Sequence, residues 1–345
     1  MNLILFNFES NQDSQALAFA LDWLNEIAKN VDKLYVISLR CGEYKVNDNV
    51  EVYCINQDKK NKIQTIFSIW KVLKLIHNKD TNINGYFVHM AHYFVPLIYP
   101  FAKYYNQKIV LWYAHKSTPI TLKIAVVLAD KIFSISSQSM RLATDKFEPV
   151  GHGIDTTNRF LLKKEFRSSI KNIVTVGRIS KVKNVDMIVD VFLSLNRDDI
   201  YLYIVGDALV GDDDIYLKSI KESIPKHKEK NIIFTGTISF EELPEVYKDI
   251  DLSINLSDTG SLDKTIIEPM AMGIPIITSN DSAKEIFSHL DGEGVYLLDE
   301  KKDLRKTLNK EIVSTKNFNR NLLREEVLKN HSLSHLSKKI VNEFK

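Results

Sequence analysis

The sequence predicts an α/β protein built from two domains, each with a parallel β-sheet covered by helices. A chain of 345 residues is long enough for two domains with separate cores. Short apolar runs alternate with amphipathic segments in both halves, a pattern typical of parallel sheets buried on both faces. Between residues 155 and 170 the alternation gives way to a polar, charged segment, which we interpret as the linker between the domains.

The first half contains six apolar runs that we expect to form strands: Leu3–Phe8, Leu34–Leu39, Val50–Ile55, Tyr86–His89, Ile109–Trp112 and Lys131–Ile135. Helical patterns lie between most of them. Ser14–Lys29, for example, places Leu17, Leu21, Leu24 and Ile27 near one face. The predicted N-terminal domain covers residues 1–155.

The second half repeats the arrangement, with strands expected at Ile173–Val176, Tyr201–Val205, Ile232–Thr235, Leu252–Asn255, Ile274–Thr278 and Val295–Leu298. The predicted C-terminal domain covers residues 156–325. The last stretch, from Asn317 to Lys345, is expected to be helical, and we expect its final part, 326–345, to pack back on the N-terminal domain.

Composition excludes several classes of protein. A net charge of +2 gives no overall attraction to nucleic acid, and no apolar run approaches the roughly 20 residues that a membrane helix needs. The N-terminal segment MNLILFNFES lacks a basic region, so it is expected to be a first strand and not a signal peptide. Cys41 and Cys54 lack metal-site spacing, and two free thiols would fit a reduced, cytoplasmic setting.

The stretch from Ser257 to Thr278 has the pattern of a ligand site. A polar loop follows an apolar strand and leads into a short helix, predicted from Asp263 to Met272. The start of a helix presents backbone N–H groups and a positive dipole end, which suit an anion or a hydroxyl-rich ligand. Glu268 lies about one and a half turns inside that helix. Alternatively, Gly260 is only a turn residue and Glu268 only a solvated helix residue.

Glycine and basic residues follow the strands of the second half. Gly177, Gly206, Gly236 and Gly260 each fall at or just beyond a strand end, where a backbone without side chains lets a ligand approach. The first strand is followed by no GxGxxG motif, and the chain has no GxxxxGK[ST] motif.

Arg178 follows Gly177 directly, and Lys181 and Lys183 come next. Together with residues 260–263, these cations could hold a diphosphate. Alternatively, Arg178 and Lys183 are solvated surface charges.

Two segments of this chain resemble the donor domain of retaining glycosyltransferases of family 4 (glycosyl transferases group 1). They are VGRISKVKN and FTGTISFEELPEVYKDIDLSINLSDTGSLDKTIIEPMAMGIPIIT. This resemblance covers about residues 172–280. The first half resembles the family more weakly, through LWYAHKS (111–117), VGHGIDT (150–156) and NQDSQALAFALDWL (11–24). The resemblance implies the GT-B fold, in which two Rossmann-like domains face each other across a cleft.

The family resemblance also implies site residues. Arg178 and Lys183 would hold the diphosphate of a nucleotide-sugar and stabilise its charge as it leaves, so that no metal or other cofactor is needed. Glu268 would accept hydrogen bonds from the ribose hydroxyls. Gly177 and the backbone N–H groups of Ser261, Leu262 and Asp263 would contact the sugar or a phosphate. The loop at Thr235 would receive the base, and His115 would lie near the transferred sugar.

Two positions depart from the family pattern. The family has a pair of glutamates with seven residues between them; Glu268 fits the second, but the first falls on Gly260. Asp258 or Asp263 could replace the missing carboxylate, or the loop backbone could take over its work. The loop after the first strand lacks the usual glycines. There, Asn11 and Asp13 could contact the acceptor or a phosphate, or could cap the helix expected near Ser14.

The segment 59–79 carries six lysines and no acidic residue. Ile63, Ile66, Phe67, Trp70 and Leu73 share a helical face, so the segment could lie on an anionic membrane surface. Alternatively, it is a helix packed on the sheet with its lysine stems along the apolar surface.

The sequence therefore predicts a retaining, hexosyl-type glycosyltransferase. It would move a sugar from a UDP- or GDP-linked donor to a hydroxyl of a glycan or lipid-linked acceptor, in the synthesis of cell-surface polysaccharide or glycoconjugates. The expected location is the cytoplasm, with membrane association on the cytoplasmic face if segment 59–79 binds lipid. Two alternatives remain: another enzyme on the same fold, such as a nucleotide-sugar epimerase or a glycogen-phosphorylase-like protein, or a sugar-nucleotide-binding protein that has lost catalysis.

Overall fold

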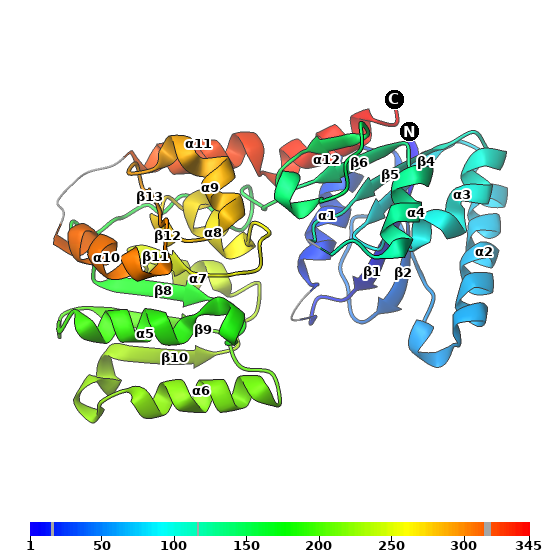
Figure 1. The fold of residues 1–345 in the computed structure, drawn as a ribbon. Helices are drawn as coiled ribbons and strands as arrows, with labels where there is room; N and C mark the ends of the chain where they lie inside the picture. The colour runs from blue at the N-terminus through cyan, green and yellow to red at the C-terminus, as the bar shows by residue number, and fades with distance from the viewer. Residues whose placement is uncertain (15–16, 116, 314–318) are drawn as a thin grey trace. The chain divides into compact units, whose positions relative to one another are not determined.

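The computed structural model of the chain describes residues 1–14, 17–115, 117–313 and 319–345, which divide into two compact units (Figure 1). The first unit comprises residues 1–155 together with 330–345, and the second comprises residues 156–329. Each unit contains one sheet of parallel strands, seven in the first and six in the second. The predicted α/β class with two parallel-sheet units is confirmed.

The first sheet has the strand order β3-β2-β1-β4-β5-β6-β7. Its strands are β1 (Asn2–Ser10), β2 (Lys33–Cys41), β3 (Val50–Cys54), β4 (Ile83–His89), β5 (Lys108–Trp112), β6 (Lys131–Ser134) and β7 (Phe147–Pro149). Its helices are α1 (Phe19–Ala28), α2 (Lys62–Lys79), α3 (Phe94–Tyr104), α4 (Ile120–Leu128) and α12 (Leu333–Asn342). One face of the sheet shares a core with α2, α3 and α4, while α1 and α12 pack together on the other face (Figure 1).

The second sheet has the strand order β10-β9-β8-β11-β12-β13. Its strands are β8 (Asn172–Val176), β9 (Tyr201–Val205), β10 (Ile232–Gly236), β11 (Leu252–Asn255), β12 (Ile276–Thr278) and β13 (Val295–Leu297). The helices are α5 (Val185–Ser194), α6 (Asp212–Ser223), α7 (Leu243–Lys248), α8 (Lys264–Ala271), α9 (Asp281–Phe287), α10 (Leu304–Val313) and α11 (Arg320–Asn330). Short 3₁₀ turns occur at Gln57–Lys59, Ser137–Ser139, Lys181–Lys183, Lys226–Asn231, Ser288–Leu290 and Lys301–Asp303. No helix in the described segments is both long and apolar enough to cross a lipid bilayer.

The observed elements differ from the prediction at α1, at the C-terminal stretch and at β7. Helix α1 begins at Phe19 and not near Ser14, and residues 15–16 lie outside the described part of the chain. The C-terminal stretch forms two helices, α11 and α12, instead of one, because the Ser332 hydroxyl accepts a hydrogen bond from the His335 N–H and so caps a new helix. Asn317, the predicted start of that stretch, lies outside the described residues. Strand β7 was not predicted, since three residues ending in proline give no periodic signal.

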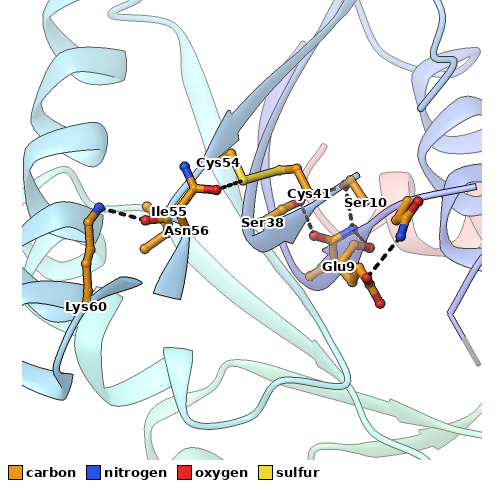
Figure 2. The surroundings of a disulfide bond; sticks show 10 residues. Glu9, Ser10, Ser38, Cys41, Cys54, Ile55, Asn56 and Lys60 are labelled. Carbon is orange, nitrogen blue, oxygen red and sulfur yellow. Dashed lines mark hydrogen bonds between the residues drawn. A yellow bond between two sulfur atoms is a disulfide. The ribbon is translucent and has the colours of Figure 1, made fainter. Parts of the chain in front are cut away.

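Cys41 and Cys54 form a disulfide between the ends of β2 and β3, so the prediction of two free thiols is wrong (Figure 2). These strands are neighbours whose register pairs Ser38 with Cys54, which leaves the two cysteine Cα atoms 6.0 Å apart. That separation suits a disulfide. The inference from free thiols to a reducing compartment therefore loses its basis.

Candidate active site

In the second sheet, the order in which strands are added reverses between β8 and β11. The chain leaves β8 to form β9 and β10 on one side, and returns to place β11 against the other side of β8. In parallel α/β sheets, the carboxyl ends of two such strands border the crevice in which ligands bind. The loops that leave these two strands are residues 177–184 and 256–263, the same segments that the sequence singled out.

Lys183 connects the two loops. Its Nζ lies 2.6 Å from Asp263 Oδ2 and 3.2 Å from Ser257 Oγ. A Cβ on Gly177 would lie 3.6 Å from Lys183 Cε, so the lysine stem runs close beside the backbone at the end of β8. Burial opposes ionisation of Asp263, but the charge and hydrogen bond of Lys183, together with hydrogen bonds from Asn255 and Ser257, outweigh this and lower the pKa of Asp263. Lys183 is therefore a fixed, paired cation and not a solvated surface charge.

Backbone and side-chain hydrogen bonds hold the loop after β11 against the turn that contains Lys183. The Asp258 N–H donates to Val182 O at 2.9 Å, and Asn184 Nδ2 donates to Leu256 O at 2.8 Å. Asn184 adopts a left-handed conformation, with φ of 53°, which lets its amide reach across to the neighbouring loop. These contacts fix the spacing between the two loops.

The far side of the same loop is held by the start of α9. Asn280 Nδ2 donates to Ser261 O at 2.9 Å, and Ser282 Oγ donates to Gly260 O at 3.1 Å. Two carbonyl oxygens of the loop are thus directed toward α9. Gly260 has φ of 72°, in the left-handed region that favours glycine. A glutamate at this position would have to adopt a strained backbone, which gives a local reason for its absence.

Both aspartates proposed as substitutes for the missing glutamate already have partners. Asp263 is bound by Lys183, and Thr259 Oγ1 donates to its Oδ1 at 3.0 Å. Asp258 accepts a hydrogen bond from Asn184 at 3.1 Å and forms an ion pair with Lys301. Both carboxylates thus contribute to the shape of the loop.

Arg178 pairs with a different carboxylate from Lys183. Its Nε is 3.6 Å from Asp213 Oδ2, at the start of α6, and its side chain is half-exposed. The structure therefore divides the two predicted cations between two carboxylates. Arg178 retains enough exposed surface to turn toward an anionic ligand.

Glu268 on α8 has a buried carboxyl, with only 2% of its surface exposed. Burial raises the pKa of Glu268 to about 7, and the charges of Lys264 and Arg159 oppose that rise only in part. Within the described chain, Glu268 Oε2 has no hydrogen-bond partner, and neither does Oη of the fully buried Tyr247. Burial raises the pKa of Tyr247 well above 10, and the nearby Glu268 charge adds to this. The alternative of a solvated helix residue is wrong, and these two unsatisfied atoms suit a ligand hydroxyl or a water.

Glycines at the ends of β8, β9 and β10 pack backbone against backbone. A Cβ on Gly206 would lie 2.1 Å from Gly177 O, and the Gly206 N–H donates to Gly236 O at 2.9 Å. Thr235, predicted to lie by the base, directs its hydroxyl to Gly236 O at 2.9 Å. The rim of the sheet therefore carries no side chain at Gly177, Gly206 and Gly236.

His115 follows β5 in the first unit, and its side chain is exposed and not buried. The Ser117 N–H donates to its Nδ1 at 3.0 Å. In the neutral ring this leaves the proton on Nε2, where it can be donated to a ligand oxygen. Lys116, between the two, lies outside the described residues.

Asn11 and Asp13 lie in the loop after β1, near the carboxyl edge of the first sheet. The Asp13 N–H donates to Asn11 Oδ1 at 3.1 Å, a local turn. Neither residue caps α1, because that helix begins at Phe19 and has no side-chain cap. The capping alternative is wrong, and their contact with an acceptor stays a prediction.

Sequence reasoning missed the polar residues that support the site. Asn255, at the end of β11, donates from Nδ2 to Asp263 Oδ2 at 3.1 Å and to Thr265 Oγ1 at 3.0 Å. Asn280 and Tyr247 were also missed. A polar residue at the carboxyl end of an otherwise apolar strand was an available signal for Asn255, whereas Tyr247 looked like any core aromatic.

Residues 170–314 match the family model described as glycosyl transferases group 1. The second unit is a group 1 glycosyltransferase domain. The curated mannosylfructose-phosphate synthase of Agrobacterium fabrum is 26% identical over 140 residues, which cover 39% of this chain and 30% of that protein. The chain thus spans less than a third of that relative. An uncharacterized glycosyltransferase of Haemophilus influenzae is 26% identical over 289 residues, 77% of each chain.

The group 1 domain sits within a fold that is shared along the whole chain. A crystal structure of Anabaena Alr3699/HepE in complex with UDP and glucose matches with a TM-score of 0.72 and 16% identity, covering 99% of each chain. At this identity the similarity shows the fold alone. The two Rossmann-like units are those of the GT-B glycosyltransferases, as the sequence predicted.

Proposed function

We propose that this chain is a retaining hexosyltransferase that uses a UDP- or GDP-linked sugar and glycosylates a hydroxyl of a glycan or lipid-linked acceptor. The group 1 domain and the GT-B fold support transfer from a nucleotide-sugar, and the neighbouring Anabaena protein binds UDP and glucose. The observation that carries the proposal is the Lys183 ammonium fixed between two loops at the switch point of the second sheet. Synthesis of cell-surface polysaccharide or glycoconjugates is the proposed setting.

The proposed role of Lys183 follows from its hydrogen-bonding capacity. An ammonium group has three N–H donors, and two of them are directed at Asp263 and Ser257. The third can bind an oxygen of the donor diphosphate. Because Asp263 keeps the amine in place before the donor arrives, little reorganisation is needed as the leaving diphosphate gains negative charge. Arg178 would turn from Asp213 to a second diphosphate oxygen.

The donor's ribose is proposed to lie at Glu268. A ribose hydroxyl donating to Glu268 Oε2 would satisfy a buried acceptor that has no partner in the described chain. The N–H groups of Ser261, Leu262 and Asp263 would meet the sugar or distal phosphate, and Gly177 and Thr235 would border the diphosphate and base. In the first unit, His115 would contact the transferred sugar, and Asn11 and Asp13 the acceptor.

The proposed chemistry uses no metal ion or other cofactor, because Arg178 and Lys183 together offset the charge of the leaving diphosphate. Loss of either cation should therefore lower kcat more than it raises KM. We also propose that segment 59–79 makes peripheral contact with an anionic membrane, which would suit a lipid-linked acceptor.

A thermal-shift panel of nucleotides and nucleotide-sugars tests the donor site. A ligand that binds only the folded state stabilises it by about 2.7 kcal/mol at a hundred-fold excess over Kd. We expect a shift for one nucleotide diphosphate family. It should be lost in Glu268→Ala, smaller in Arg178→Ala and kept in Lys218→Ala, a control on an exposed lysine of α6. A shift that all three variants keep would contradict the placement of the site.

The same panel leads to a test of the activity. Release of nucleotide diphosphate that requires an acceptor indicates a transferase and not an epimerase. Donor binding without turnover on any acceptor would indicate a binding protein, and would contradict the proposed transfer while leaving the donor site intact.

A further inference from the structure

Helices α2, α3 and α4 form a surface on the first unit that carries exposed apolar residues, which we call the α2–α4 surface. The three helices cover one face of the sheet (Figure 1). Trp70 Nε1 on α2 donates to Leu97 O on α3 at 3.0 Å, and α3 packs beside α4. Exposed large apolar side chains of the three helices are Ile63, Phe67, Trp70, Leu75, Tyr104, Ile120, Ile124 and Val127.

Core packing explains only some of the apolar residues of α2. This helix buries Ile69, Leu73 and Ile76 against the sheet. Ile63 and Phe67 lie on a different side of the helix and are 66% and 62% exposed. The sequence-based assignment of these residues and Leu73 to one face is therefore wrong: the helix packs on the sheet through one apolar stripe and presents a second to solvent.

Helix α4 adds an observation that the sequence did not provide. It buries only Leu122 and Ala125, whereas Ile120 and Val127 are 75% and 72% exposed. A helix that is apolar on nearly all sides is normally buried in a core or in lipid. In this structure its outer side is bare, and exposed apolar patches mark interaction surfaces.

Charge identifies the kind of partner. None of the three helices contains an aspartate or glutamate, while basic residues occur on each of them: Lys62, Lys71, Lys74, Lys103 and Lys123. Lys79, at the end of α2, is paired with Glu51 and is not counted with them. Lysines beside exposed aliphatic and aromatic side chains are typical of surfaces that rest in the headgroup region of an anionic bilayer. An acid-free surface is complementary to anionic lipid and does not complement a second copy of itself.

We propose that the α2–α4 surface docks on an anionic lipid bilayer, with Ile63, Phe67, Ile120 and Val127 inserted among the headgroups and the lysines paired with lipid phosphates. This extends the membrane contact proposed for segment 59–79 to a second, independent helix. It does not depend on the transfer reaction, since docking requires neither donor nor acceptor.

Vesicle co-sedimentation of the full chain tests this directly. We expect binding to vesicles containing phosphatidylglycerol at low salt, much weaker binding to pure phosphatidylcholine, and release as salt is raised. Ile120→Glu with Val127→Glu should lower the partition coefficient about tenfold or more. The matched control is Val210→Glu with Ile215→Glu, two exposed apolar residues in the second unit. This control should bind vesicles as the wild type does.

Further measurements separate lipid docking from self-association of the chain. Lys71→Gln with Lys74→Gln should reduce the preference for anionic over neutral vesicles, without removing apolar contacts. Equal losses in the Ile120/Val127 pair and in the control pair would overturn the proposal, as would absence of binding at low salt. A dimer in gel filtration that the Ile120/Val127 pair converts to a monomer, with vesicle binding unchanged, would assign the surface to self-association instead.

Discussion

Glu268→Gln should make the stability of the second unit less dependent on pH. Desolvation of the buried carboxyl raises its pKa from 4.5 to about 7. The folded chain therefore holds this proton more tightly than the unfolded chain does. The resulting stabilisation is complete below pH 4.5 and is lost as the pH rises through 7. A shift of this size corresponds to about 3 kcal/mol for one group, and glutamine, which does not titrate, should abolish it.

Urea denaturation of wild type and Glu268→Gln at about pH 5 and about pH 8 measures this difference. Trp23, Trp70 and Trp112 all lie in the first unit, so tryptophan fluorescence follows that unit while far-UV circular dichroism follows both. The unfolding free energy of the second unit should differ between wild type and Glu268→Gln by an amount that changes with pH. For the first unit, this difference should not change with pH. A difference that stays constant with pH would show that the carboxyl ionises normally, and would refute the desolvation argument.

The raised pKa of Glu268 also predicts that donor binding is coupled to release of a proton. The charged groups that act on this carboxyl are Lys264, Arg159 and Asp263. If ribose hydroxyls donate to the ionised form, binding below about pH 7 must release a proton, so donor affinity should rise with pH up to that value. Calorimetry in two buffers of different ionisation enthalpy would detect the released proton in the wild type and its absence in Glu268→Gln. Equal proton release in both proteins would contradict the assignment.

Lys183→Ala should lower kcat by about a hundred-fold or more with a smaller change in KM, and equal effects in Lys218→Ala, an exposed lysine of α6, would contradict a specific role. Gly260→Glu should not raise activity, and the strained backbone at φ of 72° should cost about 1–2 kcal/mol in a melting experiment, whereas an activated variant would show that the loop lacks only a carboxylate. Cys41→Ser with Cys54→Ser should lower the unfolding free energy of the oxidised first unit by about 3 kcal/mol, as for a closed loop of this length, and should not affect the protein in reductant. Chelation by EDTA should leave the transfer rate unchanged, and a loss restored by a divalent cation would refute the proposed metal-free chemistry.

Strand positions were readable from sequence because buried parallel strands are short, continuous apolar runs. Predicted Leu252–Asn255 and Tyr201–Val205 coincide with β11 and β9. The sequence also showed glycines at the strand ends, and the packing explains why glycine is required there. A side chain at Gly206 would meet the carbonyl of Gly177, so the rim requires glycine for close packing whether or not a ligand is present.

Pairings between distant residues were not readable. The sequence placed Arg178 and Lys183 on one rim, but it could not show that Asp213 and Asp263 would each take one of them. Nor could it join Cys41 to Cys54, because that contact depends on which strands are neighbours in the sheet.

Helix α2 shows most clearly why an amphipathic pattern underdetermines structure. Ile63, Phe67 and Trp70 recur at helical spacing, and so do Ile69, Leu73 and Ile76. At 3.6 residues per turn both sets form stripes, separated by about a third of the helix circumference. Periodicity alone cannot say which stripe meets the sheet. The core takes the second stripe, and Trp70 of the first contacts α3 within the folded unit. Ile63 and Phe67 stay 66% and 62% exposed, so the reason for their apolar character lies in whatever surface this helix contacts.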